Sequence, residues 1–150
     1  MEILLPRSKT DQLREGEKVF IAKTNSEYCP VKNTLSFLEA ASLDIKTDGE
    51  AFLIPSLNKK KNGHVASKSR GISYTRAYEI FKEHIKAKNL DPSLYGLHSF
   101  RSGGASKAAN NGISDRLISK HGRWSTETAR DGYIKDSNEN RLCISKNLGL

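Results

Sequence analysis

The sequence has few of the residues and patterns that serve metal, redox or membrane functions. Its two cysteines, Cys29 and Cys143, stand too far apart for any metal-ligand spacing. It lacks H-E-x-x-H and C-x-x-C patterns, dense carboxylate clusters and a nucleotide-binding glycine loop. No apolar run approaches the ~20 residues that span a bilayer, and residues 1–9 lack the charge order of a signal peptide. We therefore expect no metal, no cofactor, no membrane partner, and reduced thiols in an intracellular protein.

The chain carries a clear surplus of positive charge. Lysine and arginine number 25 against 17 aspartates and glutamates, so the net charge is +8 and the pI is about 9.5. With 36% hydrophobic and 28% charged residues, the 150-residue chain has the composition of one soluble globular domain. The surplus favours a polyanionic partner such as DNA, RNA or an acidic membrane surface. Charge alone fits a merely basic soluble protein equally well.

The spacing of apolar residues predicts a mainly α (α+β) fold, a helical domain with a small antiparallel hairpin at its N-terminal end. Residues 2–5 and 18–22 are predicted to be strands joined by a polar, basic loop. Pro30 should open a helix that ends near residues 43–44. Further helices are predicted from Ser73, over residues 99–110, from Ser114 to Gly122, from Ser125 or Thr126 through Tyr133, and over residues 139–148.

A basic stretch over residues 58–70 shows no clear period and is predicted to be a loop. It follows residues 52–54, an apolar run stopped by Pro55 that fits either a third strand or a buried turn. The cations of the stretch are candidates for phosphate contacts along a DNA duplex, and a solvated loop explains them equally well. These candidates are Lys59, Lys60, Lys61 and Arg70.

Four residues near the C-terminal end have side chains suited to phosphate chemistry. His98 and Arg101 are three apart, so they share one face of the predicted helix. Trp124 and Tyr133 are nine apart, on either side of the Ser125–Thr126 cap. Taken singly, each residue is more readily explained by packing or by a solvated surface than by chemistry.

Taken together, His98, Arg101, Trp124 and Tyr133 resemble the tyrosine recombinase (phage integrase) family. That family carries an H-x-x-R pattern, then a histidine or tryptophan, then a nucleophilic tyrosine nine residues later. The text L-H-S-F-R-S-G-G-A-S-K-A-A and the glycine two residues before Trp124 are also typical of it. The resemblance covers nearly the whole chain, and residues 98–133 are its most specific part.

Two further positions follow from the resemblance. Ser8-Lys9-Thr10, in the loop of the predicted hairpin, resembles the family's lysine-bearing β-turn, which gives Lys9 a catalytic role. His121 competes with Trp124 for the His/Trp position, but it stands twelve residues before Tyr133, so Trp124 is preferred. His121 and Arg123 are then expected to be helix-end residues or phosphate contacts.

The resemblance implies strand cleavage and rejoining through a 3′-phosphotyrosyl link formed by Tyr133. Arg101 and His98 would stabilise the phosphate charge, Trp124 would donate its indole N–H, and Lys9 would protonate the leaving 5′ oxygen. The implied partner is double-stranded DNA, bound by a tetramer, while the free chain is expected to be a monomer. The implied location is DNA-associated, in the nucleoid or a nucleus.

The sequence also departs from the family pattern. A further arginine, which the family carries on a helix before the sheet, has no counterpart here, and neither does the N-terminal DNA-clamping domain. We therefore expect residues 1–150 to be a partial catalytic domain that cleaves DNA poorly by itself. The alternatives are a catalytically weakened DNA-binding or assembly module, a type IB topoisomerase fragment, and a basic helical domain with an accidental match. The histidine of the H-x-x-R pattern argues against the topoisomerase.

Overall fold

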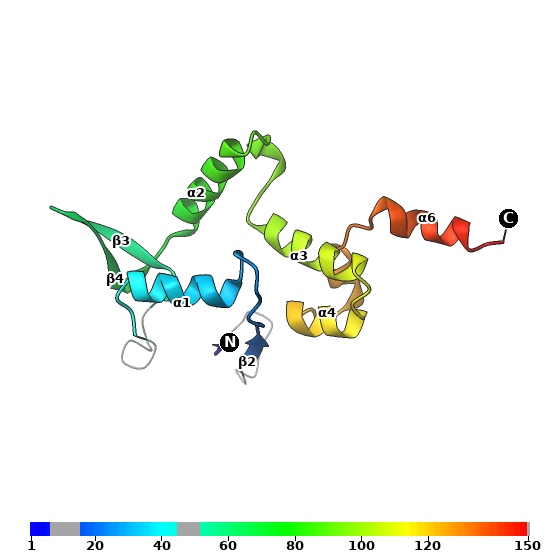
Figure 1. Ribbon diagram of the computed structural model, residues 1–150, viewed down its shortest axis with the longest axis horizontal. Helices are drawn as coiled ribbons and strands as arrows, with labels where there is room; N and C mark the ends of the chain where they lie inside the picture. The colour runs from blue at the N-terminus through cyan, green and yellow to red at the C-terminus, as the bar shows by residue number, and fades with distance from the viewer. Residues whose placement is uncertain (7–15, 45–51, 150) are drawn as a thin grey trace. The chain divides into compact units, whose positions relative to one another are not determined.

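The computed structural model describes residues 1–6, 16–44 and 52–149. These residues form two compact units, Met1–Ala77 and Tyr78–Leu150, which are treated separately below. Figure 1 labels most of their elements along the chain. Within the described ranges there are six α-helices and two two-stranded antiparallel sheets, which confirms the mainly α (α+β) class.

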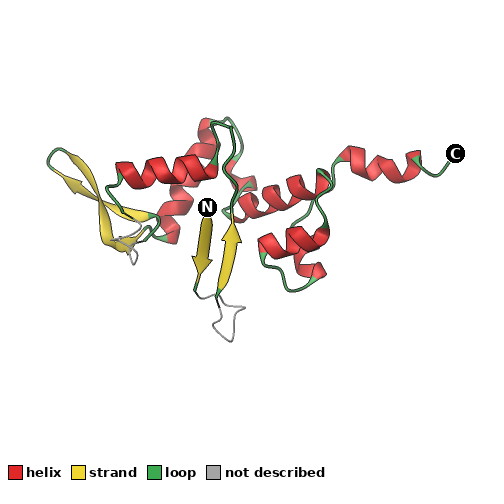
Figure 2. Ribbon diagram, turned by 60° about the horizontal axis from the view of Figure 1, so that its bottom comes forward, coloured by secondary structure: helices red, strands yellow, loops and turns green. Residues whose placement is uncertain are grey.

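The first unit opens with a short antiparallel hairpin, as predicted. Strand β1 (Glu2–Leu5) pairs with β2 (Glu17–Phe20), with Ile3 opposite Val19. The second strand begins one residue earlier than predicted and ends two residues earlier. Residues 7–15 of the connecting loop lie outside the described part of the chain, and Lys9 lies among them. Figure 2 shows the paired strands in yellow.

Helix α1 (Pro30–Ala40) begins at Pro30, because proline fits the first helical turn, where no N–H partner is needed. It ends a few residues before the predicted limit. There Ser42 takes a left-handed conformation (φ 53°), and the N–H of Leu43 turns back to bond the carbonyl of Leu38. The buried side chains of α1 and its C-terminal turn make the core of the unit: Val31, Leu38 and Leu43.

Cys29, the residue that caps α1, is a fully buried free thiol. Its Sγ accepts the N–H groups of Lys32 at 3.5 Å and Thr24 at 3.2 Å. Because these bonds favour the thiolate, they lower the pKa of Cys29 from 9.0 to about 7. Cys143 is a free, exposed thiol on the last helix.

The lowered pKa of Cys29 predicts a pH-dependent stability. Between the folded pKa of about 7 and the unfolded value of 9.0, the folded chain binds fewer protons than the unfolded chain. The free energy of unfolding should therefore rise with pH across this window, and the gain should be lost as pH falls through about 7. Urea denaturation at about pH 6.5 and about pH 8.5 measures the difference. Cys29→Ser, which keeps a capping oxygen but does not titrate there, should lack this rise; an equal rise in the variant would contradict the assignment.

The prediction of a loop over residues 58–70 is wrong, because these residues form a second hairpin. Strand β3 (Pro55–Lys60) pairs antiparallel with β4 (Gly63–Gly71), with Lys60 opposite Gly63. Gly63 (φ 135°) follows the two-residue turn in a conformation that side chains disfavour. Lysines and serines lack the apolar alternation of a half-buried strand, which hid the hairpin from sequence reasoning.

The apolar run before this hairpin is neither a strand of its own nor a buried turn. Phe52, Leu53 and Ile54 are all exposed, and Pro55 begins β3 instead of stopping a strand. Proline is acceptable there because the first residue of a strand can forgo a ladder N–H. The carbonyl of Ile54 nevertheless accepts the N–H of Ile72, so backbone pairing reaches past the strand end.

The second unit is built from helices around a small apolar centre. Helix α2 (Tyr74–Ala87) runs into it from the first unit; its predicted cap, Ser73, accepts the N–H of Arg76 at 3.1 Å. Buried Phe81 of α2 packs edge-on against Phe100, with ring centroids 5.0 Å apart. The helices that follow are the 3₁₀ turn η1 (Pro92–Leu94), α3 (His98–Asn110), α4 (Asp115–Gly122), α5 (Glu127–Asp131) and α6 (Asn138–Lys146).

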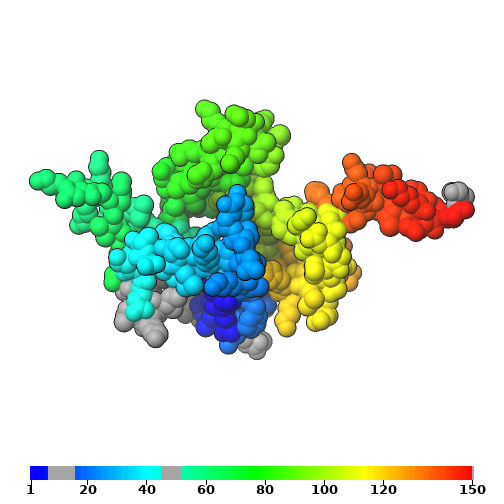
Figure 3. All heavy atoms as spheres, viewed as in Figure 1, coloured from blue at the N-terminus to red at the C-terminus, as the bar shows by residue number. Residues whose placement is uncertain are grey.

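The last helix exposes apolar side chains. Leu142 and Ile144 of α6, and Leu148 just beyond it, are more than half exposed, at 52%, 72% and 62%. Figure 3 draws this segment in orange and red. None of the described helices is long and apolar enough to cross a membrane.

Candidate active site

Helix α3 carries the histidine and the arginine of the H-x-x-R pattern in its first turn. His98 is the first residue of the helix and is exposed, and Arg101 follows it half-buried. The helix starts where Gly96 ends the preceding turn, with the Gly96 N–H bonded to the Ser99 hydroxyl at 3.0 Å. Both side chains therefore project from the same end of one rigid element.

Trp124 follows α4 through a sharp reversal of the chain. Arg123 is left-handed (φ 55°), and the N–H of Trp124 returns to the carbonyl of Ser119 at 3.0 Å. Gly122 ends this helix as predicted, and it also lies against the Trp124 side chain. A Cβ added at Gly122 would lie 1.9 Å from the indole of Trp124, so only glycine leaves room for the ring.

Tyr133 lies beyond its helix and not within it, contrary to the prediction. Helix α5 is capped by Thr126, whose hydroxyl accepts the N–H of Ala129 at 3.2 Å, and it ends at Asp131. After Gly132, the N–H of Tyr133 bonds the carbonyl of Arg130 at 2.9 Å. The tyrosine is thus placed by a turn at the end of a five-residue helix, and its position depends on contacts with other segments.

The four predicted residues come together, although they lie on three segments. The Tyr133 ring centroid is 5.4 Å from that of Trp124 and 6.4 Å from that of His98. The Arg101 guanidinium carbon lies 4.3 Å from the Trp124 ring and 5.3 Å from the Tyr133 ring. One N–H of Arg101 also donates to the carbonyl of Gly122. A guanidinium flanked by two aromatic rings is held in one orientation, which suits it to grip a phosphate.

Sequence reasoning missed Arg130, which is buried and joins α4 to α5. Its guanidinium bonds Asp131 at 2.8 Å, Asp115 at 3.2 Å and the Ser119 hydroxyl at 3.4 Å. The bond to Asp131 raises the pKa of Arg130, with help from the charge of Asp115. Asp115 and Ser119 are four apart and share a face of α4, but nothing in the sequence links that face to Arg130. By tying α5 to α4, this arginine sets where Tyr133 stands relative to Trp124.

The contact between Gly122 and Trp124 leads to a prediction. Gly122→Ala should push the indole off the Arg101 guanidinium and lower the free energy of unfolding by about 1–3 kcal/mol. Because Trp124 is the single tryptophan, its fluorescence emission reports the displacement directly. Gly104→Ala is the matched control, since a Cβ there meets nothing within 4 Å. Equal emission spectra for Gly122→Ala and the wild type would mean that the ring does not rest on Gly122.

The remaining predicted site residues are more scattered. His121 is exposed on the last turn of α4, and Arg123 is half-buried next to it. In the first unit, the cations of the β3–β4 hairpin are all exposed, and Arg70 donates to the Asn58 side chain at 3.0 Å. The predicted phosphate contacts among them are Lys59, Lys60, Lys61 and Arg70, and Lys68 of β4 is a further exposed cation. Lys9 lies outside the described residues.

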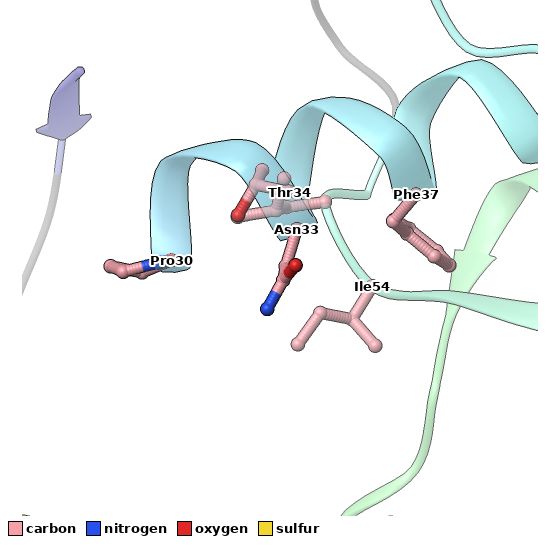
Figure 4. A pocket seen from close by; sticks show the side chains of 6 residues that line it. Pro30, Asn33, Thr34, Phe37 and Ile54 are labelled. Carbon is pink, nitrogen blue, oxygen red and sulfur yellow. The ribbon is translucent and has the colours of Figure 1, made fainter. Parts of the chain in front are cut away.

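Two other features of the described residues bear on chemistry. No group of three His, Cys, Asp or Glu side chains among them is placed to hold a metal ion. A hollow of about 370 Å³ in the first unit is lined by side chains that do not titrate (Figure 4). Its lining residues are Pro30, Asn33, Thr34, Phe37, Leu53 and Ile54.

Comparison with known proteins gives one informative likeness. An integrase/recombinase xerD homolog of Selenomonas ruminantium is 28% identical over 138 residues, which cover 91% of this chain. A continuous span of that length includes residues 98–133 whichever end it omits. The chain spans 38% of the relative's length. No family model and no solved structure matches the chain. At 28% identity, the likeness supports a tyrosine recombinase family at most.

Proposed function

We propose that this chain is a tyrosine recombinase catalytic domain, which carries out site-specific recombination or integration by cleaving and rejoining DNA through Tyr133. The observation that carries the proposal is the convergence of Arg101, Trp124 and Tyr133 from three segments around one guanidinium. The order of these residues along the chain and the nine-residue spacing between Trp124 and Tyr133 do not require them to be close in space. Their contacts therefore support the proposal beyond what the sequence pattern does.

The reaction needs a nucleophile, charge stabilisation and an acid. The Tyr133 hydroxyl loses its proton and attacks the phosphorus, while the bond from phosphorus to the 5′ oxygen breaks and that oxygen takes up a proton. The new 3′-phosphotyrosyl ester keeps the phosphate activated, so the 5′ hydroxyl of another strand can attack it. That second step releases Tyr133 and joins the strands without an external energy source.

Each neighbour of Tyr133 has a role that its position supports. Arg101 has a fixed guanidinium and would stabilise two non-bridging oxygens as their charge grows. His98, exposed at the helix start, would hydrogen-bond the phosphate or carry a proton. The Trp124 indole N–H would donate to the same phosphate. Lys9, on family resemblance alone, would protonate the leaving 5′ oxygen.

The partner of this chemistry is double-stranded DNA, and the +8 net charge is consistent with it. We propose that the protein acts inside the cell, associated with DNA, and assembles on its target as a tetramer, while the free chain is monomeric. His121 and Arg123, on the reversal that leads to Trp124, would contact phosphates next to the cleaved one.

A covalent-trapping assay tests the proposal. The substrate is a labelled duplex with a nick close to the cleavage position. After cleavage, the short fragment between the cleaved bond and the nick, which carries the new 5′ hydroxyl, diffuses away, so the phosphotyrosyl product accumulates. The expected result is a denaturant-stable adduct whose mass places the nucleotide on Tyr133. Binding of the duplex without any adduct, for this chain and for one extended upstream, would favour the DNA-binding or assembly module.

The β3–β4 hairpin should also contribute to DNA binding, since a two-stranded ribbon fits the major groove and this one is rich in exposed lysines. Replacing Lys59, Lys60 and Lys61 by alanine should weaken DNA binding. It should also reduce the slope of log K against log salt by about 3, because each phosphate contact contributes ~0.9. Fluorescence titrations at several salt concentrations measure the slope.

The matched control for this prediction removes the same charge elsewhere. Lys86, Lys88 and Lys146 are exposed and lie at the ends of α2 and α6. Their replacement by alanine should change the slope by less than about 1. Similar slopes for the two triple variants would mean that the hairpin makes no particular phosphate contact and acts only through net charge.

A further inference from the structure

Three polar side chains of α3 hold the chain segment that follows Tyr133. Ser102, Ser106 and Asn110 are four apart from one to the next, so they form one stripe along the helix. All three are half-buried, and all bond to residues 133–140. We call these three residues the α3 clamp.

The first two members bond the backbone of Tyr133 itself. The Ser102 hydroxyl donates to the Tyr133 carbonyl at 2.6 Å, and the Ser106 hydroxyl donates to the same carbonyl at 3.3 Å. The Ser106 oxygen also accepts the N–H of Lys135 at 2.8 Å. Both hydrogen-bonding capacities of Ser106 are thus used on the two peptides that flank Ile134.

The third member extends the same contact toward α6. The Asn110 side chain donates to the carbonyl of Lys135 at 2.9 Å and accepts the N–H of Ser137 at 2.9 Å. Its oxygen also accepts from the Asn140 side chain at 2.8 Å. The clamp therefore replaces the hydrogen bonds that this non-helical stretch of backbone would otherwise make with water.

The placement of Tyr133 makes these bonds relevant to its chemistry. Tyr133 lies past the end of α5, so no further turn of helix fixes its peptide on the C-terminal side. The clamp supplies that restraint from α3, the helix that also carries His98 and Arg101. The positions of Tyr133, His98 and Arg101 are thereby all fixed relative to one rigid helix, α3. A misplacement of ~1 Å in such an arrangement costs about 10²-fold in rate.

We propose that Ser102, Ser106 and Asn110 are positioning residues that hold the Tyr133 peptide against α3, so that its hydroxyl faces the phosphate bound by Arg101. The effect of the α3 clamp on catalysis rests on the proposed function. The inference goes beyond that function, because none of these side chains touches the reacting atoms. The contact itself can be tested without any reaction.

The first test measures the clamp in the free chain. Ser106→Ala should raise the hydrogen-exchange rate of the Lys135 N–H by at least about tenfold and weaken nuclear Overhauser contacts between the Tyr133 and Trp124 rings. Ser106→Thr, which keeps the hydroxyl, should restore both. If Ser106→Ala changes neither readout while the chain stays folded, the clamp is overturned, whatever the chain catalyses.

The second test measures its effect on the reaction. At saturating nicked duplex, Ser106→Ala should form the Tyr133 adduct about 10- to 100-fold more slowly, with unchanged DNA affinity, and Ser106→Thr should recover the rate. An unchanged adduct rate in Ser106→Ala would overturn the positioning role. If neither the wild-type chain nor one extended upstream forms an adduct, the proposed function fails, and the exchange measurement alone decides whether the clamp exists.

Discussion

Tyr133→Phe is expected to abolish the covalent protein–DNA adduct, with the rate of adduct formation falling to background. The substitution removes only the hydroxyl oxygen, so no atom remains that could attack the phosphorus. The ring keeps its neighbours, with centroids 5.4 Å from Trp124 and 6.4 Å from His98, so the site should stay assembled. The measurement combines gel separation under denaturing conditions with mass analysis of the adduct. DNA affinity should change by less than about twofold.

The control for this result is a tyrosine outside the site. Tyr28, 79% exposed in the turn before α1, can be replaced by phenylalanine without touching the four residues around Arg101. Tyr28→Phe should form adduct at the wild-type rate. If Tyr133→Phe still forms the adduct, another side chain is the nucleophile and the proposed mechanism is wrong.

Arg101→Ala is expected to lower the rate of adduct formation by about 10²–10³-fold, the usual cost of removing one preorganised donor to a charged transition state. Arg101→Lys should recover little of this loss. Lysine keeps the charge, but it cannot hold two phosphate oxygens in a planar fork while contacting the Trp124 ring. Single-turnover rates at saturating DNA separate this loss from weaker binding.

Two comparisons make the Arg101 result specific. Arg116, exposed on the first turn of α4, is a matched arginine, and Arg116→Ala should leave the single-turnover rate unchanged. Trp124 emission should shift in both Arg101 variants, because the guanidinium lies 4.3 Å from that ring. A full rate for Arg101→Lys would show that a point charge suffices, and the orientation of the guanidinium against the Trp124 ring would then have no part in catalysis.

Much of the secondary structure could be predicted from local signals. Pro30, Ser73 and Thr126 begin helices in the structure as the capping rules predict, and the first hairpin lies within two residues of its predicted limits. Capping works at this range because the bonds that start a helix join residues only two or three positions apart. His98 and Arg101 are also only three positions apart, so they could be placed on one helical face from the sequence.

The errors have physical causes that act over longer distances. The β3–β4 hairpin escaped prediction because its strands carry lysines and serines, and only cross-strand bonds identify it. Gly122 ends its helix as predicted, but the packing of the Trp124 ring against it could not be read from the sequence. Arg130 carried no signal at all, since its partners Asp115 and Ser119 belong to a different helix.

By itself, the sequence determined the class of the fold, because that depends on composition, capping and spacing along the chain. The four candidate catalytic residues came from the resemblance of their order and spacing to the tyrosine recombinase pattern. Only the tertiary structure decided that Tyr133 stands outside its helix, that the Arg101 guanidinium contacts both the Trp124 and the Tyr133 ring, and that the α3 clamp holds the tyrosine's peptide. The last two of those features are contacts between residues more than 20 positions apart. Such contacts arise from the packing of whole elements against one another, which no local pattern specifies.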